Sequence, residues 1–119
     1  MLQSFQPQYQ LDYDGRVIEL RLDGGHVTDE ALVQVKELTA LRTLSLYGSS
    51  ISDAGLEHLK ELGYLQALGL GATKITDQGI ARLEQVPALR WLWVTEDPQL
   101  SKAALDKLKQ THPDLTIYQ

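Results

Sequence analysis

The feature that most constrains this chain is a hydrophobic pattern that recurs every 24 residues. Two columns of apolar residues keep this spacing, and they are Leu20, Leu44, Leu68 and Leu92, followed two positions later by Leu22, Leu46, Leu70 and Val94. A third column precedes them at Val17, Leu41, Leu65 and Leu89. Such a period indicates stacked supersecondary units, because one unit of this size cannot bury its apolar face alone.

Each unit changes its periodicity halfway along. The alternation of Leu44 and Leu46 predicts a strand with one buried face, and the spacing of Leu56, Leu59 and Leu62 predicts a helix packed against it. A hydroxyl residue and then an aspartate begin the predicted helices at Thr28-Asp29, Ser52-Asp53 and Thr76-Asp77. The hydroxyl suits the N-cap position, and the carboxylate suits the positive end of the helix dipole. Ser101-Lys102 keeps the hydroxyl but lacks the aspartate.

The third unit carries a family resemblance. Residues 65–80 read LQALGLGATKITDQGI, which resembles the pattern L-x-x-L-x-L-x-x-T-x-I-T-D-x-G-L of bacterial leucine-rich repeats related to the ribonuclease-inhibitor and F-box types. The resemblance covers about residues 15–110. It implies an α/β fold, namely a short leucine-rich-repeat solenoid with parallel strands on its concave face and helices on its convex face. It also implies a polar ladder after the strands, at Gly25, Ser49, Thr73 and Asp97.

The ends of the chain predict caps for this solenoid. Alternation over residues 9–13, followed by Asp14-Gly15, predicts a β-hairpin-like N-terminal cap with a two-residue turn and an antiparallel strand. Residues 115–117 predict one more short strand at the C-terminus, so we expect a complete small protein. The expected organisation is one domain over 1–119, with a cap at 1–14, repeats at about 15–38, 39–62, 63–86 and 87–110, and a cap at 111–119.

Charge and composition exclude several kinds of function. A net charge of −5 argues against binding to nucleic acid, whose phosphates need a basic surface, and the lack of cysteine excludes disulfides and thiolate metal sites. The sequence shows no signal peptide and no apolar run long enough to cross a bilayer, so we expect a cytoplasmic protein without a membrane partner. His26, His58 and His112 lack the spacing of metal ligands, and we expect each to be a solvated surface residue. No nucleophile–base or phosphate-binding motif is present, so we expect no catalytic residue, no metal and no cofactor.

The residues between the buried leucines indicate where a partner would bind. Read across the predicted strands, they form three columns: Glu19, Thr43, Ala67 and Trp91; Arg21, Ser45, Gly69 and Trp93; Asp23, Tyr47, Gly71 and Thr95. Exposed tryptophan is enriched at binding hot spots. We therefore expect a partner-binding site at Tyr47, Trp91 and Trp93, with a charged rim of Glu19, Arg21 and Asp23. The other interpretation is that both indoles lie over the trough of Ala67, Gly69 and Gly71 and simply cover the sheet.

These features favour a non-catalytic module for protein–protein recognition that binds an unidentified protein through its concave face. Two alternatives stay open. One is an inhibitor or immunity protein that neutralises a toxin or enzyme. The other is an assembly protein that forms a homodimer through the tryptophan patch.

Overall fold

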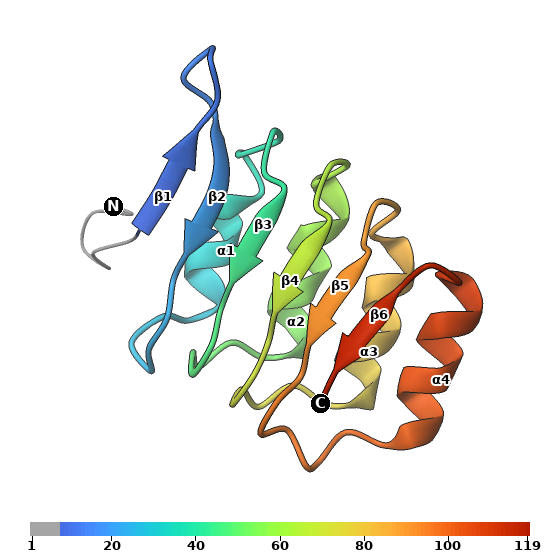
Figure 1. Ribbon diagram of the computed structural model, residues 1–119. Helices are drawn as coiled ribbons and strands as arrows, with labels where there is room; N and C mark the ends of the chain where they lie inside the picture. Colours follow the sequence, from blue (N-terminus) through green and yellow to red (C-terminus); the bar gives the residue numbers. More distant parts are fainter. Residues whose placement is uncertain (1–7) are drawn as a thin grey trace.

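The computed structural model describes residues 8–119, which form one six-stranded sheet. The strands are β1 (Gln8–Leu11), β2 (Val17–Arg21), β3 (Thr43–Ser45), β4 (Ala67–Gly69), β5 (Trp91–Trp93) and β6 (Thr116–Tyr118). They lie in the sheet in the order of the chain, and Figure 1 shows them side by side from β1 to β6. The pairs from β2 to β6 are parallel, whereas β1 is antiparallel to β2, so the sheet is mixed.

The register of the parallel strands aligns the leucine columns across the sheet. Leu20 pairs with Leu44, Leu44 with Leu68, and Leu68 with Leu92. Each of these four side chains is at most 1% exposed, because it points toward the helices. The central leucines of the strands and the apolar residues of the helices form one continuous hydrophobic core.

The helical segments cover one face of the sheet only, as Figure 1 shows. They are α1 (Asp29–Val35), α2 (Asp53–Leu56) with the 3₁₀ helix η2 (Glu57–Glu61), α3 (Asp77–Arg82) with η3 (Leu83–Gln85), and α4 (Lys102–Thr111). The N-caps are Thr28, Ser52, Thr76 and Ser101, as the sequence predicts, but only the last two side chains accept a hydrogen bond from their own helix. No helix within residues 8–119 is both long and apolar enough to cross a membrane.

The N-terminal strand joins β2 through a three-residue loop, not the expected two-residue turn. The Asp12 N–H donates to the Arg16 carbonyl at 2.9 Å, and the Gly15 N–H donates to the Asp12 carbonyl at 3.1 Å. Gly15 has a φ of 81°, the left-handed conformation that such a loop requires after its β-turn. The Asp12 carboxylate accepts from the backbone of Asp14 and Arg16 and therefore holds the loop closed. Of the cap expected at 1–14, residues 1–7 lie outside the described part of the chain.

The expected solenoid is corrected to a compact α/β unit with a mixed sheet. The molecule measures 38 × 28 × 20 Å, so no axis dominates as it does in an elongated solenoid. The physical reason is the small number of units. Strands lie about 4.8 Å apart in a sheet, so six of them stack to a length similar to the width of one strand–helix unit. The strands therefore form one compact sheet with its helices on one face (Figure 1).

Candidate functional site

The sheet face opposite the helices carries the residues that the sequence singles out. We call this surface the open face. The register places its side chains in two rows across the strands, Glu19, Thr43, Ala67, Trp91 and Thr116 in one and Arg21, Ser45, Gly69, Trp93 and Tyr118 in the other. Side chains alternate along a strand, so burying the leucines toward the helices turns both rows away from the core.

The two tryptophans stand on β5 as exposed side chains, each 38% accessible to solvent. The Trp93 ring stacks on Tyr118 of β6, with a centroid distance of 5.1 Å and an interplanar angle of 14°. The Arg90 guanidinium lies 5.6 Å from the ring centroid of Trp91, within the range of a cation–π contact. Each indole is thus held by a neighbour and keeps part of its surface free.

Tyr118 is a member of this aromatic group that the sequence reading missed. It flanks the half-buried Ile117 as Trp93 flanks Leu92, so the same alternation one strand later would have placed it on the open face. Its side chain is 42% exposed and covers one face of the Trp93 ring.

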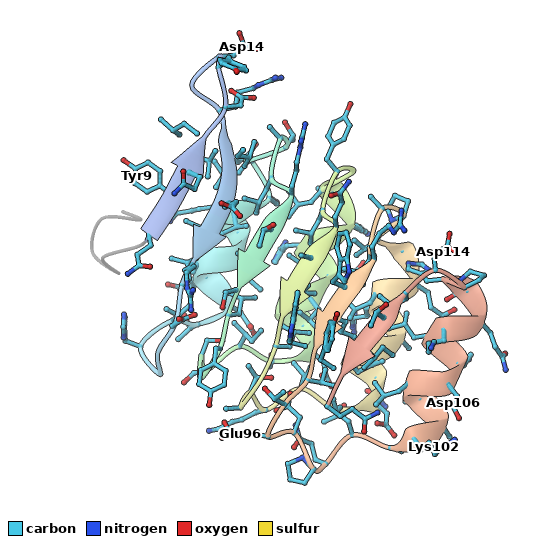
Figure 2. The ribbon with its side chains drawn as sticks, viewed as in Figure 1. Tyr9, Asp14, Glu96, Lys102, Asp106 and Asp114 are labelled. Atoms are coloured by element: carbon cyan, nitrogen blue, oxygen red, sulfur yellow. The ribbon has the colours of Figure 1, made fainter. Side chains whose placement is uncertain are left out.

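Tyr47 lies across the end of the trough, at Gly71. Its hydroxyl donates a hydrogen bond to the carboxylate of Glu96, on the loop that follows β5. Figure 2 labels Glu96 on this loop, at the lower end of the sheet. Because ionisation would break this bond and place a phenolate beside a carboxylate, the pKa of Tyr47 is raised. The ring passes so close to Gly71 that a Cβ there would lie 2.9 Å from Tyr47 Cδ2.

The tryptophans do not fill the trough at Gly69. A Cβ on Gly69 would first meet Ser45, at 3.5 Å from its Oγ, and no indole atom is among its nearest neighbours. A hollow of about 240 Å³ remains above Gly69, with Trp93 and Tyr47 among its walls. The indoles therefore do not cover the two glycines of the trough: Tyr47 covers Gly71, and the position over Gly69 is open, whereas Ala67, which pairs with Trp91, is buried.

The charged rim is partly neutralised within the chain. Arg21 Nη2 lies 3.3 Å from the Asp23 carboxylate, which also accepts a hydrogen bond of 3.0 Å from Ser45 Oγ. Glu19 stands in the other row, where it pairs with Gln10 of β1 and borders a second hollow of about 260 Å³. The structure thus places all six expected site residues on the open face or at its end, and it adds Tyr118 and Glu96.

Of the polar positions after the strands, Thr73 and Asp97 are joined by a hydrogen bond, whereas Ser49 Oγ has no hydrogen-bond partner in residues 8–119. Ser49, Thr73 and Asp97 are buried, and Asp97 Oδ1 accepts a hydrogen bond of 3.0 Å from the Thr73 N–H. Asp97 Oδ2 has no hydrogen-bond partner in residues 8–119. Burial disfavours the charged carboxylate, and the pKa of Asp97 is therefore raised.

The described residues offer no cluster of ligands for a metal. No group of three or more histidine, cysteine, aspartate or glutamate side chains suited to a metal occurs within residues 8–119. Two histidines are less solvated than predicted: His58 and His112 are both partly buried, and His112 Nε2 lies 2.8 Å from the Val86 carbonyl. Since a carbonyl only accepts, this nitrogen carries the proton and His112 ties the end of α4 to the preceding unit.

Comparison with known proteins corrects the family assignment. No family model matches this chain, and no curated protein matches it. A solved structure that does match is a chain of "Structure of Chaetomium Mex67:Mtr2 subunits", with a TM-score of 0.64 and 18% sequence identity over 82% of this chain and 78% of that chain. At this identity the likeness shows a shared fold only. The expected membership of the bacterial leucine-rich-repeat group is therefore not upheld, and the chain is described by its own architecture.

Proposed function

We propose that this chain is a non-catalytic recognition module that binds another protein through the open face. The observation that carries the proposal is a group of partly exposed aromatic side chains around an unfilled hollow. Trp91, Trp93, Tyr47 and Tyr118 are each between 38% and 44% exposed on or beside one sheet face. Exposed apolar surface gathered in this way is typical of interaction sites, and tryptophan and tyrosine dominate binding energies there.

The fold likeness agrees with a role in an assembly. The matched chain is, by its title, one of the subunits of Mex67:Mtr2, so its fold occurs in a protein that assembles with another. We therefore take a protein as the partner of the open face.

The test is quantitative capture of partners from the native lysate, with the wild type and the double variant Trp91→Ala/Trp93→Ala as baits. Loss of the indoles should weaken a direct interaction by about 2 kcal/mol or more, as at other hot spots. The affinity of each captured protein, once purified, is then measured by calorimetry.

A matched control removes exposed aromatic rings elsewhere. Tyr13 and Tyr64 are 109% and 66% exposed and lie outside the two rows of the open face, so Tyr13→Ala/Tyr64→Ala should bind as the wild type does. Equal affinity of the wild type and the folded tryptophan variant would place the interface elsewhere on the molecule.

A further inference from the structure

Two glycines of the open face differ in what the fold requires of them. At Gly71 a Cβ would lie 2.6 Å from Thr95 Oγ1 and 3.0 Å from the Thr95 carbonyl oxygen, so the chain itself excludes a side chain. At Gly69 the nearest atoms would be Ser45 Oγ at 3.5 Å and Ser45 Cα at 3.6 Å, which are ordinary van der Waals contacts. Packing therefore explains Gly71 and does not explain Gly69.

Where no steric contact excludes a side chain, a glycine in a strand lowers the stability of the fold, and this applies to Gly69. It ends the three-residue strand β4 in the middle of the sheet, where a larger residue would pack better and lose less conformational entropy on folding. The space that it leaves is the hollow of about 240 Å³ between neighbouring strands. This space is available to a group that does not belong to the chain.

The residues that line the hollow determine which chemical group can bind in it. Gly69 pairs with Trp93, and Tyr118 covers the Trp93 face on the β6 side, so the other indole face is turned toward the hollow. On the opposite side stands Arg21, whose guanidinium is held at Asp23. Tyr47, fixed by Glu96, closes the end.

A flat aromatic ring can contact both Trp93 and Arg21 at the same time. It stacks on the free face of the Trp93 indole, and its own π face receives the cation of Arg21. A cationic side chain would meet the like charge of Arg21, and an aliphatic one would gain neither interaction. The exposed carboxylates of Glu19, Asp23 and Glu96 outnumber the guanidiniums of Arg21 and Arg90 on this part of the open face, so a positive charge next to the ring is favoured.

We propose that the protein partner of the open face inserts an aromatic side chain, flanked by a basic residue, into the hollow over Gly69, between the indole of Trp93 and the guanidinium of Arg21. This inference rests on the proposed recognition function and adds the chemistry of the contact.

The test uses the whole chain and three synthetic pentapeptides. The first has tyrosine between two lysines, the second has leucine in place of the tyrosine, and the third has two glutamates in place of the lysines. Binding is followed by the amide signal of Gly69 and the indole N–H signal of Trp93 in ¹H–¹⁵N NMR spectra. The first peptide should shift both signals at millimolar concentration, with a dissociation constant about tenfold below those of the other two.

The decisive variant is Gly69→Leu, which fills the hollow from its floor. The contacts available to a Cβ at this position are ordinary, so the variant should fold, and an unchanged thermal midpoint verifies that. The matched control is Gly63→Leu, because a Cβ at Gly63 meets nothing within 4 Å. We expect Gly69→Leu to abolish the peptide shifts and Gly63→Leu to leave them unchanged.

Several results would overturn the inference. They are no shift from the first peptide at millimolar concentration, equal binding of the leucine peptide, or full binding by folded Gly69→Leu. Capture of partners from the lysate tests binding in the hollow separately from binding to the open face. A partner lost by Trp91→Ala/Trp93→Ala but kept by Gly69→Leu keeps the open face as the binding surface and rejects the hollow, whereas a partner kept by both variants rejects both.

Discussion

Asp29, Asp53 and Asp77 each accept a hydrogen bond from the backbone of the residue that caps the next helix. The distances from Oδ1 to the N–H groups of Ser52, Thr76 and Ser101 are 2.8, 2.7 and 2.9 Å. The hydroxyls of Ser52 and Thr76 also donate to the second oxygen of the same carboxylate. These aspartates therefore join successive units, and the favourable position in the helix dipole is only part of their role.

The same contacts account for two glycines. A Cβ at Gly55 would collide with the Asp29 carboxylate, and one at Gly79 would collide with the Asp53 carboxylate. The first helix has Ala31 at the corresponding place, where no preceding unit supplies an aspartate. In α2 and α3 the glycine thus leaves room for the carboxylate of the previous unit, whereas α4 has Ala104 at this place beside the bond from Ser101 to Asp77.

We expect Gly79→Ala to destabilise the protein by about 1–3 kcal/mol. The methyl group must displace the Asp53 carboxylate from its hydrogen bonds to Thr76, and overpacking and lost hydrogen bonds each cost energy on this scale. Urea unfolding followed by circular dichroism measures the change. Gly63→Ala is the control, and equal stability of the two variants would contradict the steric explanation.

The buried carboxylate of Asp97 should change the stability with pH in the direction opposite to that of most carboxylates. Because burial raises its pKa, the folded state holds the proton more tightly than the unfolded state, whose carboxyl has the ordinary value of 3.8. Its contribution to stability is full below 3.8 and is lost as the pH rises through the folded-state value. Asp97→Asn keeps an acceptor for the Thr73 N–H without the charge, so it should melt higher than the wild type at about pH 7 and equally at about pH 3.

The control for this prediction is an exposed carboxylate. Asp114, labelled in Figure 2 between α4 and β6, is solvent-exposed, and Asp114→Asn should leave the melting temperature nearly unchanged at both pH values. A lower melting temperature of Asp97→Asn at neutral pH would mean that the charge itself stabilises this end of the sheet.

Among the elements, the β1–β2 hairpin is held by local polar contacts in its loop. It is the one antiparallel pair in the described sheet, and its strand β1 is exposed along its whole length. The loop is held by Asp12, whose carboxylate accepts from the Arg16 N–H at 2.9 Å and from Arg16 Nε at 2.8 Å. The hairpin is stabilised by hydrogen bonds and not by burial of β1, because no helix covers this strand.

We expect Asp12→Ala to loosen this hairpin while the parallel strands stay intact. Amide exchange should accelerate for the β1–β2 pair and stay unchanged in β3 and β4, which hydrogen-exchange mass spectrometry or NMR resolves. The backbone hydrogen bond from Arg16 chiefly lowers the pKa of Asp12. Its stabilising effect is therefore complete above the ordinary value of 3.8 and disappears as the pH falls through the lower folded-state value, where wild type and variant should converge. Equal exchange at neutral pH would contradict this role.

The whole molecule is held by one core that runs through all the units. The helices pack in chain order, α1 on α2, α2 on α3 and α3 on α4, and no buried gap divides the apolar cluster. Neighbouring units complete each other's burial, which is the condition for cooperative folding in a chain of similar units.

We expect Leu68→Ala, at the centre of the sheet, to cost about 2–5 kcal/mol, a large part of the stability of a small domain. Leu68 is fully buried, so the substitution leaves a cavity between β3 and β5. Leu11→Ala serves as the control because Leu11 is 50% exposed on β1. Chemical unfolding gives both values, and a small effect at Leu68 would show that the units unfold independently.

The sequence by itself determined the local elements and the orientation of most of the candidate site. Alternation places Leu44 and Leu46 in the core, and the same alternation turns Trp91 and Trp93 to the opposite face. These properties follow from the two-residue period of a strand, which neighbouring residues set without reference to the rest of the chain.

Only the tertiary structure decided the overall shape and the contacts that complete the site. The pairs Tyr47–Glu96 and Trp93–Tyr118 join residues from different units, and their distance depends on how the strands align in the sheet. The compact form depends on the number of units that stack, not on the pattern within one unit. The open space over Gly69 likewise follows from where the neighbouring side chains lean, because a glycine in the sequence is equally compatible with a filled trough.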